Sequence, residues 1–70
     1  MFYYTKLKEA RLSKKKTTRE IGRVIQRSGA SISRYETGKR RPDFHTKLKL
    51  AWAYGKDINF FYEEPKKLWE

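Results

Sequence analysis

The stretch that decides the fold is Ser28 to Pro42, which reads S-G-A-S-I-S-R-Y-E-T-G-K-R-R-P. Ser28 can cap a short helix over residues 29–36, because a serine hydroxyl accepts a hydrogen bond from the first helical N–H groups. That helix carries small side chains and Arg34, and three successive cations follow it. A flat helix face beside cations suits a DNA groove, where small residues allow close approach and arginine reaches a base or a phosphate. Residues 29–36 are therefore predicted to form a recognition helix.

Composition limits the chain to one small and strongly basic domain. Its 70 residues include 18 Lys+Arg against 8 Asp+Glu, for a net charge of +10. A chain this short buries a modest part of its surface. The charge calls for a polyanionic partner, either nucleic acid or an anionic membrane surface. Ten basic and two acidic residues lie between Lys14 and Arg41, whereas Asp57 to Glu70 holds four acids and two lysines. A basic face is therefore expected over residues 14–41.

Several classes of function find no support in the residues. Cysteine is absent, which excludes disulfides and thiolate metal sites, and His45 is the single histidine. No apolar run approaches the roughly 20 residues that a membrane span needs, and Met-Phe-Tyr-Tyr at the start is too brief for a signal peptide. No acid, base and nucleophile converge. We therefore expect a cytoplasmic protein that is not an enzyme and has no cofactor, metal, membrane or small-molecule ligand.

The first part of the chain predicts two helices before the recognition helix. Residues 3–14 have apolar side chains at the spacing of one helix face. Thr17-Thr18-Arg19-Glu20 fits a capping box and should start a helix over about residues 18–26. Gly22 would permit another helix to approach closely, and Arg27-Ser28 would form the turn. The inward positions of these helices are Tyr3, Leu7, Ala10, Ile21 and Ile25.

The last part of the chain predicts two further helices and a tail. Asp43 is a plausible N-cap for a fourth helix, which Gly55 would stop. Asp57 could cap a final short helix. Residues 63–70 are interpreted as a tail whose Leu68 and Trp69 could dock. The inward positions of the two helices are Phe44, Leu48, Ala51 and Tyr54, followed by Ile58, Phe61 and Tyr62.

Three large apolar residues fall off these predicted inner faces. Val24, Trp52 and Phe60 would then be exposed, and exposed apolar patches often mark interfaces. A homodimer through the fourth and last helices, principally through Trp52 and Phe60, is one interpretation. The other is that these side chains cover the core beneath the tail.

Four segments together resemble the phage repressor and Cro-type helix-turn-helix proteins. They are L-K-E-A-R-L at 7–12, T-T-R-E-I-G at 17–22, I-S-R-Y-E-T-G-K-R-R-P at 32–42 and L-K-L-A-W-A-Y-G-K-D-I at 48–58. The resemblance covers about residues 5–62. It implies an all-α fold, a compact five-helix bundle of the lambda-repressor-like type, with a helix-turn-helix domain over 1–62. The second helix would cross the DNA backbone, and the third would lie in the major groove.

The resemblance also assigns roles to individual residues. In that family an arginine of the first helix pairs with the glutamate that ends the third helix. The resemblance therefore implies an ion pair between Arg11 and Glu36. The sequence departs from the family at the turn, where Gln26-Arg27 replaces glycine and an apolar residue. The implied base-reading residues are Gly29, Ala30, Ser31, Ser33 and Arg34. The implied backbone contacts are Thr18, Arg19, Ser28, Thr37, Lys39, Arg40 and Arg41.

These observations predict a small transcriptional regulator that binds specific sequences of double-stranded DNA, a repressor of the phage or mobile-element kind. It is expected to bind two half-sites as a homodimer. Two alternatives stay open. One is a helix-turn-helix used for protein assembly, such as an antitoxin-like or phage accessory partner. The other is a non-specific binder of nucleic acid. A charge-driven membrane role is disfavoured, because the basic residues are divided among several short helices.

Overall fold

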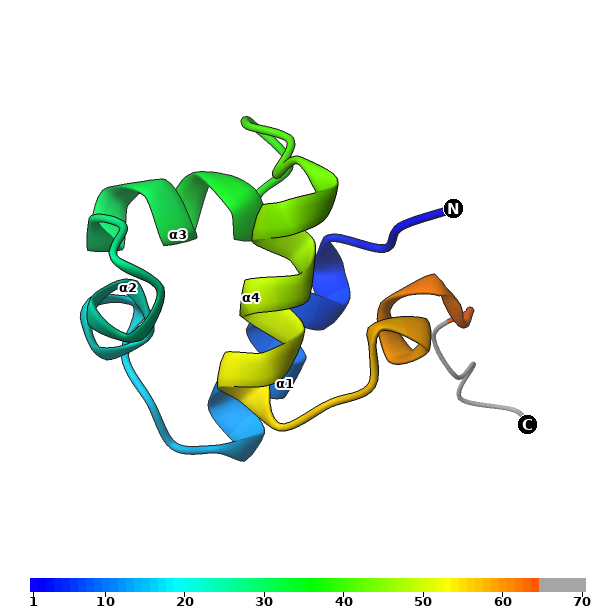
Figure 1. The fold of residues 1–70 in the computed structure, drawn as a ribbon, viewed down its shortest axis with the longest axis horizontal. Helices are drawn as coiled ribbons and strands as arrows, with labels where there is room; N and C mark the ends of the chain where they lie inside the picture. The colour runs from blue at the N-terminus through cyan, green and yellow to red at the C-terminus, as the bar shows by residue number, and fades with distance from the viewer. Residues whose placement is uncertain (65–70) are drawn as a thin grey trace.

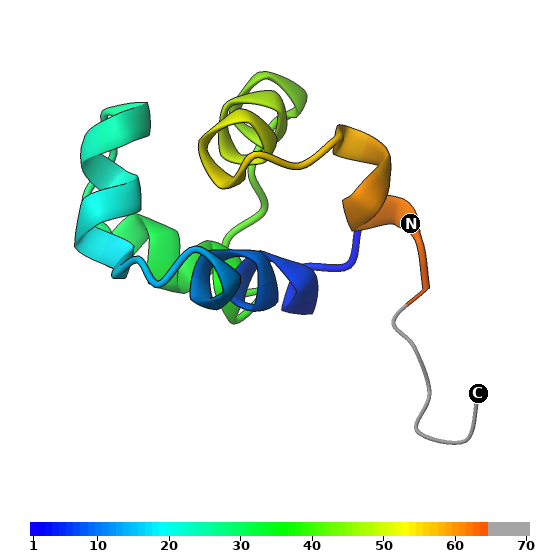
Figure 2. The same cartoon turned by 90° about the horizontal axis from the view of Figure 1, so that it is seen from below.

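The computed structural model describes residues 1–64, and it folds them into helices without a strand. Figure 1 shows α3 along one edge, α2 end-on beside it, and α4 passing in front of α1. In Figure 2, α1 and α3 lie in one layer and α4 lies in another, with α2 at one side. The elements are α1 (Thr5–Ser13), α2 (Thr18–Ile25), α3 (Gly29–Glu36), α4 (Phe44–Tyr54) and a 3-10 helix, η1 (Ile58–Tyr62).

The all-helical class expected from the sequence is confirmed over residues 1–64, whereas the count of five α-helices is not. The fifth element is the five-residue 3-10 helix η1. The first helix is shorter than the predicted range of 3–14, because it begins at Thr5 and ends at Ser13. No helix in the described part of the chain is long and apolar enough to cross a bilayer. Leu68 and Trp69 of the predicted tail lie outside the described residues.

Side-chain caps fix where every helix except α1 begins. Thr17 and Glu20 form a capping box, in which Thr17 Oγ1 accepts from Glu20 N at 3.1 Å and Glu20 Oε1 accepts from Thr17 N at 3.0 Å. Asp43 Oδ1 accepts from Thr46 N at 2.8 Å at the start of α4, and Asp57 Oδ1 accepts from Asn59 N at η1. Each cap satisfies an N–H group that has no intrahelical partner. Gly55 ends α4 in the left-handed conformation at φ 66°.

One apolar core joins all five elements. Every element contributes at least one buried side chain, and the largest fully buried ones come from α1, α3, α4 and η1. Tyr35 of α3 is buried as well. Burial of such side chains from water is the main favourable contribution to folding. The core residues are Leu7, Ala10, Ile21, Ile25, Ile32, Tyr35, Leu50, Ala51, Tyr54 and Phe61.

The predicted inner face of α4 was partly wrong. Ala51 and Tyr54 are buried as expected, but Phe44 and Leu48 are exposed, and the core contains Leu50 instead. The helix has two rows of large side chains at a spacing of four, Phe44-Leu48-Trp52 and Thr46-Leu50-Tyr54. The second row faces the core, where Tyr54 packs beside Phe61 with ring centroids 6.2 Å apart. The first row therefore lies on the surface.

Phe60 was expected to be exposed, and the structure corrects this expectation. Its ring packs edge-on against Phe61 with centroids 5.1 Å apart, and it is only half-exposed. Lys6 covers the same ring at 4.2 Å from the centroid, and its Nζ donates to the Phe60 carbonyl at 2.8 Å. The hydrogen bond and the ring satisfy this buried ammonium. Phe60 is thus part of the contact between α1 and η1.

Candidate nucleic-acid interface

A tight turn next to Gly22 joins α2 to α3. A Cβ at Gly22 would collide with the carbonyl oxygen of Arg27, and it would lie 3.1 Å from Ser28 C and 3.2 Å from Gly29 N. The turn is held by a hydrogen bond from Arg27 N to the Gly22 carbonyl at 2.7 Å. The close approach expected at Gly22 is therefore present, and it is made by the turn that leads into α3.

Gln26 adopts the backbone conformation that redirects the chain between α2 and α3. It ends α2 at φ 60°, ψ 47°, in the left-handed region. A residue with a Cβ pays about 1–2 kcal/mol there, which is why glycine is common at such positions. The departure noted in the sequence, glutamine in place of glycine, thus falls on a strained position.

Ser28 and Ser31 together form the N-terminal cap of α3. Ser28 Oγ accepts from Ser31 N at 3.1 Å and donates to Ser31 Oγ at 3.1 Å. Ser31 is 8% exposed, whereas Ser28 is exposed. Gly29 is half-buried, and a Cβ there would lie 3.2 Å from Arg19 Cα at the start of α2. The base contacts implied for Ser31 and Gly29 stay predictions, with little side-chain surface to make them.

The outward face of α3 is one row of small residues and a cation. Ala30, Ser33, Arg34 and Thr37 follow the spacing of a single helix face, and all four are exposed. Thr37 Oγ1 donates to the carbonyls of Ser33 and Arg34 at 3.1 and 3.3 Å, so this hydroxyl closes the end of the helix. The face opposite carries Ile32 and Tyr35 into the core. A helix face of small, exposed side chains can enter the major groove of duplex DNA.

Cations without carboxylate partners surround this face. Lys39, Arg40 and Arg41 are exposed in the loop after α3, and Figure 1 shows that loop projecting beyond the α3 edge. Within residues 1–64 the ion pairs are Arg11–Glu36 and Lys16–Glu20, so the loop cations and Arg34 pair with no acid in that range. Arg19 is exposed and Thr18 half-buried at the start of α2. Unpaired cations beside a flat face favour binding to phosphate.

Arg11 and Glu36 form the pair that the sequence implied. Arg11 Nε donates to Glu36 Oε2 at 2.6 Å, and Arg11 Nη2 donates to Oε1 at 3.0 Å. The side chains are 12% and 6% exposed. Arg11 Nη1 also donates to the Lys16 carbonyl at 2.8 Å. The hydrogen bond to Glu36 raises the pKa of the Arg11 guanidinium above its ordinary value. The pair ties the end of α3 to α1, and a phosphate contact by Arg11 stays a prediction.

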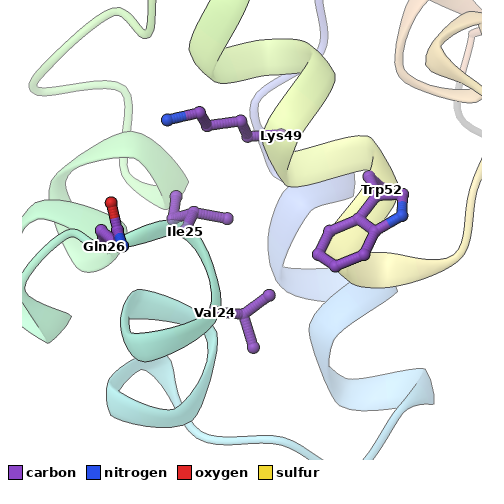
Figure 3. Close-up of a pocket in the computed structure, with 5 residues that line it drawn as sticks. All are labelled: Val24, Ile25, Gln26, Lys49 and Trp52. Atoms are coloured by element: carbon purple, nitrogen blue, oxygen red, sulfur yellow. The ribbon is translucent and has the colours of Figure 1, made fainter.

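A second surface feature is apolar and lies between α2 and α4. Val24 and Trp52 are exposed, Trp52 by 74%, and face a hollow of about 180 Å³ whose other lining residues are Ile25, Gln26 and Lys49. Figure 3 shows Val24 reaching from α2 toward the Trp52 ring of α4. The expected exposure of these two residues is correct. Phe44 and Leu48 of α4 are exposed too, and we call Phe44, Leu48 and Trp52, with Val24 of α2 beside them, the α4 apolar face.

No cluster of metal-ligating side chains accompanies these surfaces in residues 1–64. The exposed His45 lies in the first turn of α4, beside the capping Asp43. The backbone and side-chain hydrogen bonds from Thr46 hold the pKa of Asp43 below its ordinary value.

Comparison with known families agrees with this geometry. Residues 5–58 match a family described as a helix-turn-helix domain. The match covers most of the 70 residues, and the chain belongs to this helix-turn-helix family. No curated protein and no solved structure matches the chain. The family assignment points to a DNA-binding regulator.

Proposed function

We propose that this protein is a transcriptional regulator that binds specific double-stranded DNA sequences, with α3 in the major groove. The observation that carries the proposal is the exposed α3 face of Ala30, Ser33, Arg34 and Thr37, bordered by loop cations that have no carboxylate partner within residues 1–64. Arg34 can donate two hydrogen bonds to a guanine edge, and the loop can contact the adjacent backbone. Thr18, Arg19 and Ser28 would contact the backbone on the other side of the groove.

The proposed kind of regulator is a small repressor of the phage or mobile-element type with a lambda-repressor-like fold. The segments at 7–12, 17–22, 32–42 and 48–58 support this proposal through their resemblance to that family. The protein would act in the cytoplasm of a prokaryotic cell or of a phage-infected host. Repression would follow from occupation of the operator, which blocks polymerase and requires neither catalysis nor a cofactor.

The deciding experiment selects bound duplexes from a random pool and then measures their affinity as a function of salt. A specific regulator gives a consensus sequence. If about six phosphates are neutralised, log K falls against log salt with a slope near −5. A slope near zero, or a pool that stays random after selection, would contradict the proposal. A steep slope without a consensus would identify a non-specific binder of nucleic acid.

A homodimer on DNA is part of the same proposal. Trp52 and Val24 supply an exposed apolar patch that a second copy would bury. Phe60, the other residue assigned to this interface from the sequence, is covered by Lys6 and Lys56, so Trp52 is the better residue to test. A dimer would read two half-sites about one helical turn apart, as in other helix-turn-helix proteins.

Sedimentation of wild type and of Trp52→Ser, with and without the selected duplex, tests the dimer. Wild type should sediment as two copies on a palindromic duplex, and Trp52→Ser should require a higher concentration to do so. Leu12→Ser, at another exposed apolar residue on α1, is the matched control. A wild-type monomer at high micromolar concentration, both alone and on DNA, would remove the dimer from the proposal.

The α4 apolar face also supports a second candidate, in which the helix-turn-helix binds another protein. Phe44, Leu48 and Trp52 form an exposed row on one helix, which is a common way for helices to dock. An antitoxin-like or phage accessory partner would be of this kind. Co-purification with a protein at equal stoichiometry, together with no retention on heparin, would favour this candidate over DNA binding.

A further inference from the structure

A basic hollow lies between the loop that follows α3, the N-terminal residues and the start of α4. It has a volume of about 430 Å³. Its walls are the N-terminal residues Met1, Phe2 and Tyr4, the loop after α3, and Lys47 from the second turn of α4. The hollow thus continues the surface that carries the loop cations.

Among residues 1–64, the charged side chains that line this hollow are all positive. They are Arg40, Arg41 and Lys47, and no carboxylate from that part of the chain lines it. Asp43 is near in sequence, but its carboxylate is turned to the start of α4, where it accepts from Thr46 N. Neither ion pair of residues 1–64 involves a lining residue. Three cations in a concave site attract an anion more strongly than the same cations on a flat surface, because the protein walls focus the field.

Lys47 is held in place by aromatic rings. Its Nζ lies 4.7 Å from the centroid of Phe2 and 5.6 Å from that of Tyr62, and it donates to the Tyr62 hydroxyl at 3.4 Å. The side chain is half-buried. An ammonium held in this way loses less side-chain entropy when it binds an anion. Two of its donors stay available for a ligand, since the hydroxyl accepts from one.

Tyr4 is one wall of the hollow and packs against the loop. Its ring lies against Gly38, where a Cβ would come within 2.9 Å of two ring atoms, and Gly38 has φ 77°. The positive φ favours glycine at this position, and the absence of a Cβ lets the Tyr4 ring lie close to the backbone. Tyr4 is 43% exposed, so it keeps part of its surface toward solvent.

We propose that this hollow binds a phosphate of the DNA backbone, with Lys47 as a third cation beside Arg40 and Arg41. The inference rests on the proposed function, and it adds a contact that lies beyond the stretch of duplex facing α3. The ligand would be the anionic phosphodiester. The side chains that line the hollow would attract it by charge, and they would not contact the bases. The contact therefore adds affinity to every sequence and positions the protein without discriminating between bases.

The test compares Lys47→Gln with Lys49→Gln on the duplex obtained by selection. Lys49 is also half-buried on α4, but it lines the apolar hollow beside Trp52. Because each neutralised phosphate contributes about −0.9 to the slope of log K against log salt, Lys47→Gln should make the slope shallower by about 1. Lys49→Gln should leave it unchanged, and Lys47→Arg should restore it.

A second measurement protects the test against a simple loss of fold. A set of duplexes is prepared in which single phosphates are replaced by neutral methylphosphonates. At one position outside the base pairs that face α3, the replacement should lower the affinity of wild type and leave that of Lys47→Gln unchanged. Circular dichroism checks that both glutamine variants are folded. If Lys47→Gln and wild type have equal slopes and equal methylphosphonate profiles, the inference is wrong. If wild type itself has a slope near zero, it is the proposed function that fails.

Discussion

Glu36, the last residue of α3, accepts two hydrogen bonds from the guanidinium of Arg11 in α1, at 2.6 and 3.0 Å. Both side chains are largely buried, so the carboxylate that ends the proposed recognition helix is neutralised inside the protein. A carboxylate left free at that end of α3 would repel phosphate. The pair therefore affects both the stability of the fold and the electrostatics of the proposed interface.

Replacing Glu36 by Gln should lower the free energy of unfolding by about 3 kcal/mol, because it leaves the Arg11 charge buried without its partner. Thermal and urea denaturation measure the change. Glu20→Gln is the matched control, since its ion pair with Lys16 is 3.8 Å long and half-exposed, and its amide can still cap α2. The control should change stability much less than Glu36→Gln does, because an exposed ion pair contributes little. Equal, small effects of both substitutions would show that the Arg11–Glu36 pair contributes little.

Replacing Gln26 by Gly should stabilise the protein by about 0.5–1 kcal/mol. Gln26 has φ 60°, and glycine adopts this conformation without the Cβ penalty. The gain should appear as a higher urea midpoint with an unchanged m-value. Gln26→Ala keeps a Cβ and should give no gain. A Gly variant less stable than wild type would show that the glutamine side chain contributes contacts that outweigh the backbone strain.

Replacing Arg34 by Ala should cost about 1–3 kcal/mol of binding to the selected duplex, and it should relax discrimination at one base pair. Replacing Arg40 by Ala should weaken all sequences about equally, because a phosphate contact does not depend on the base. Binding titrations against a set of single-base variants of the duplex distinguish the two patterns. Uniform weakening by both variants would assign Arg34 to the backbone instead of a base.

Stability should fall on acidification as the helix caps lose their charge. Hydrogen bonds from Thr17 hold the pKa of Glu20 below its ordinary 4.5, and those from Thr46 hold the pKa of Asp43 below its ordinary 3.8. Their contribution is complete above these ordinary values, and it is lost as the pH falls through the lower values of the folded state. Melting temperatures measured from about pH 6 to about pH 2 should show this loss. The double variant Glu20→Gln, Asp43→Asn should have a shallower profile, and a profile as steep as that of wild type would assign the acid sensitivity to other carboxyls.

The starts of α2, α3 and α4 and the turn could be predicted from sequence because short-range chemistry determines them, whereas α1 has no side-chain cap and begins at Thr5 instead of at residue 3. Thr17 with Glu20, Ser28, Asp43 and Gly55 act on residues within one helical turn, and all four features are present as expected. The pairing of Arg11 with Glu36 acts over a longer range, and the sequence implied it only through resemblance to a family. Local rules and a familiar motif were therefore sufficient for the positions of α2 and α3.

The face of α4 could not be predicted in the same way. Phe44-Leu48-Trp52 and Thr46-Leu50-Tyr54 have the same spacing, and the first row looks more apolar in sequence. Contact with Phe61, which lies at the end of the described chain, decides which row is buried. The hollow beside Lys47 could not be predicted for a similar reason. Its other walls come from residues 1–4 and 38–42, and only the folded chain brings these segments together. Nothing in the sequence near Lys47 indicates those neighbours.

The hydrogen bond from Tyr3 N to the Phe61 carbonyl, at 2.7 Å, joins the first residues of the chain to η1, and Lys6 joins the same two segments through Phe60. Because η1 holds the first residues of the chain in place, fraying of η1 would also release Phe2 and Tyr4. Hydrogen exchange at Tyr3 and Lys6 should therefore proceed at the rate set by opening of η1. A cut in the backbone at that 3-10 helix would therefore impair the cationic hollow twice, through the loosened N-terminal residues and through Tyr62 of η1, whose hydroxyl accepts from Lys47.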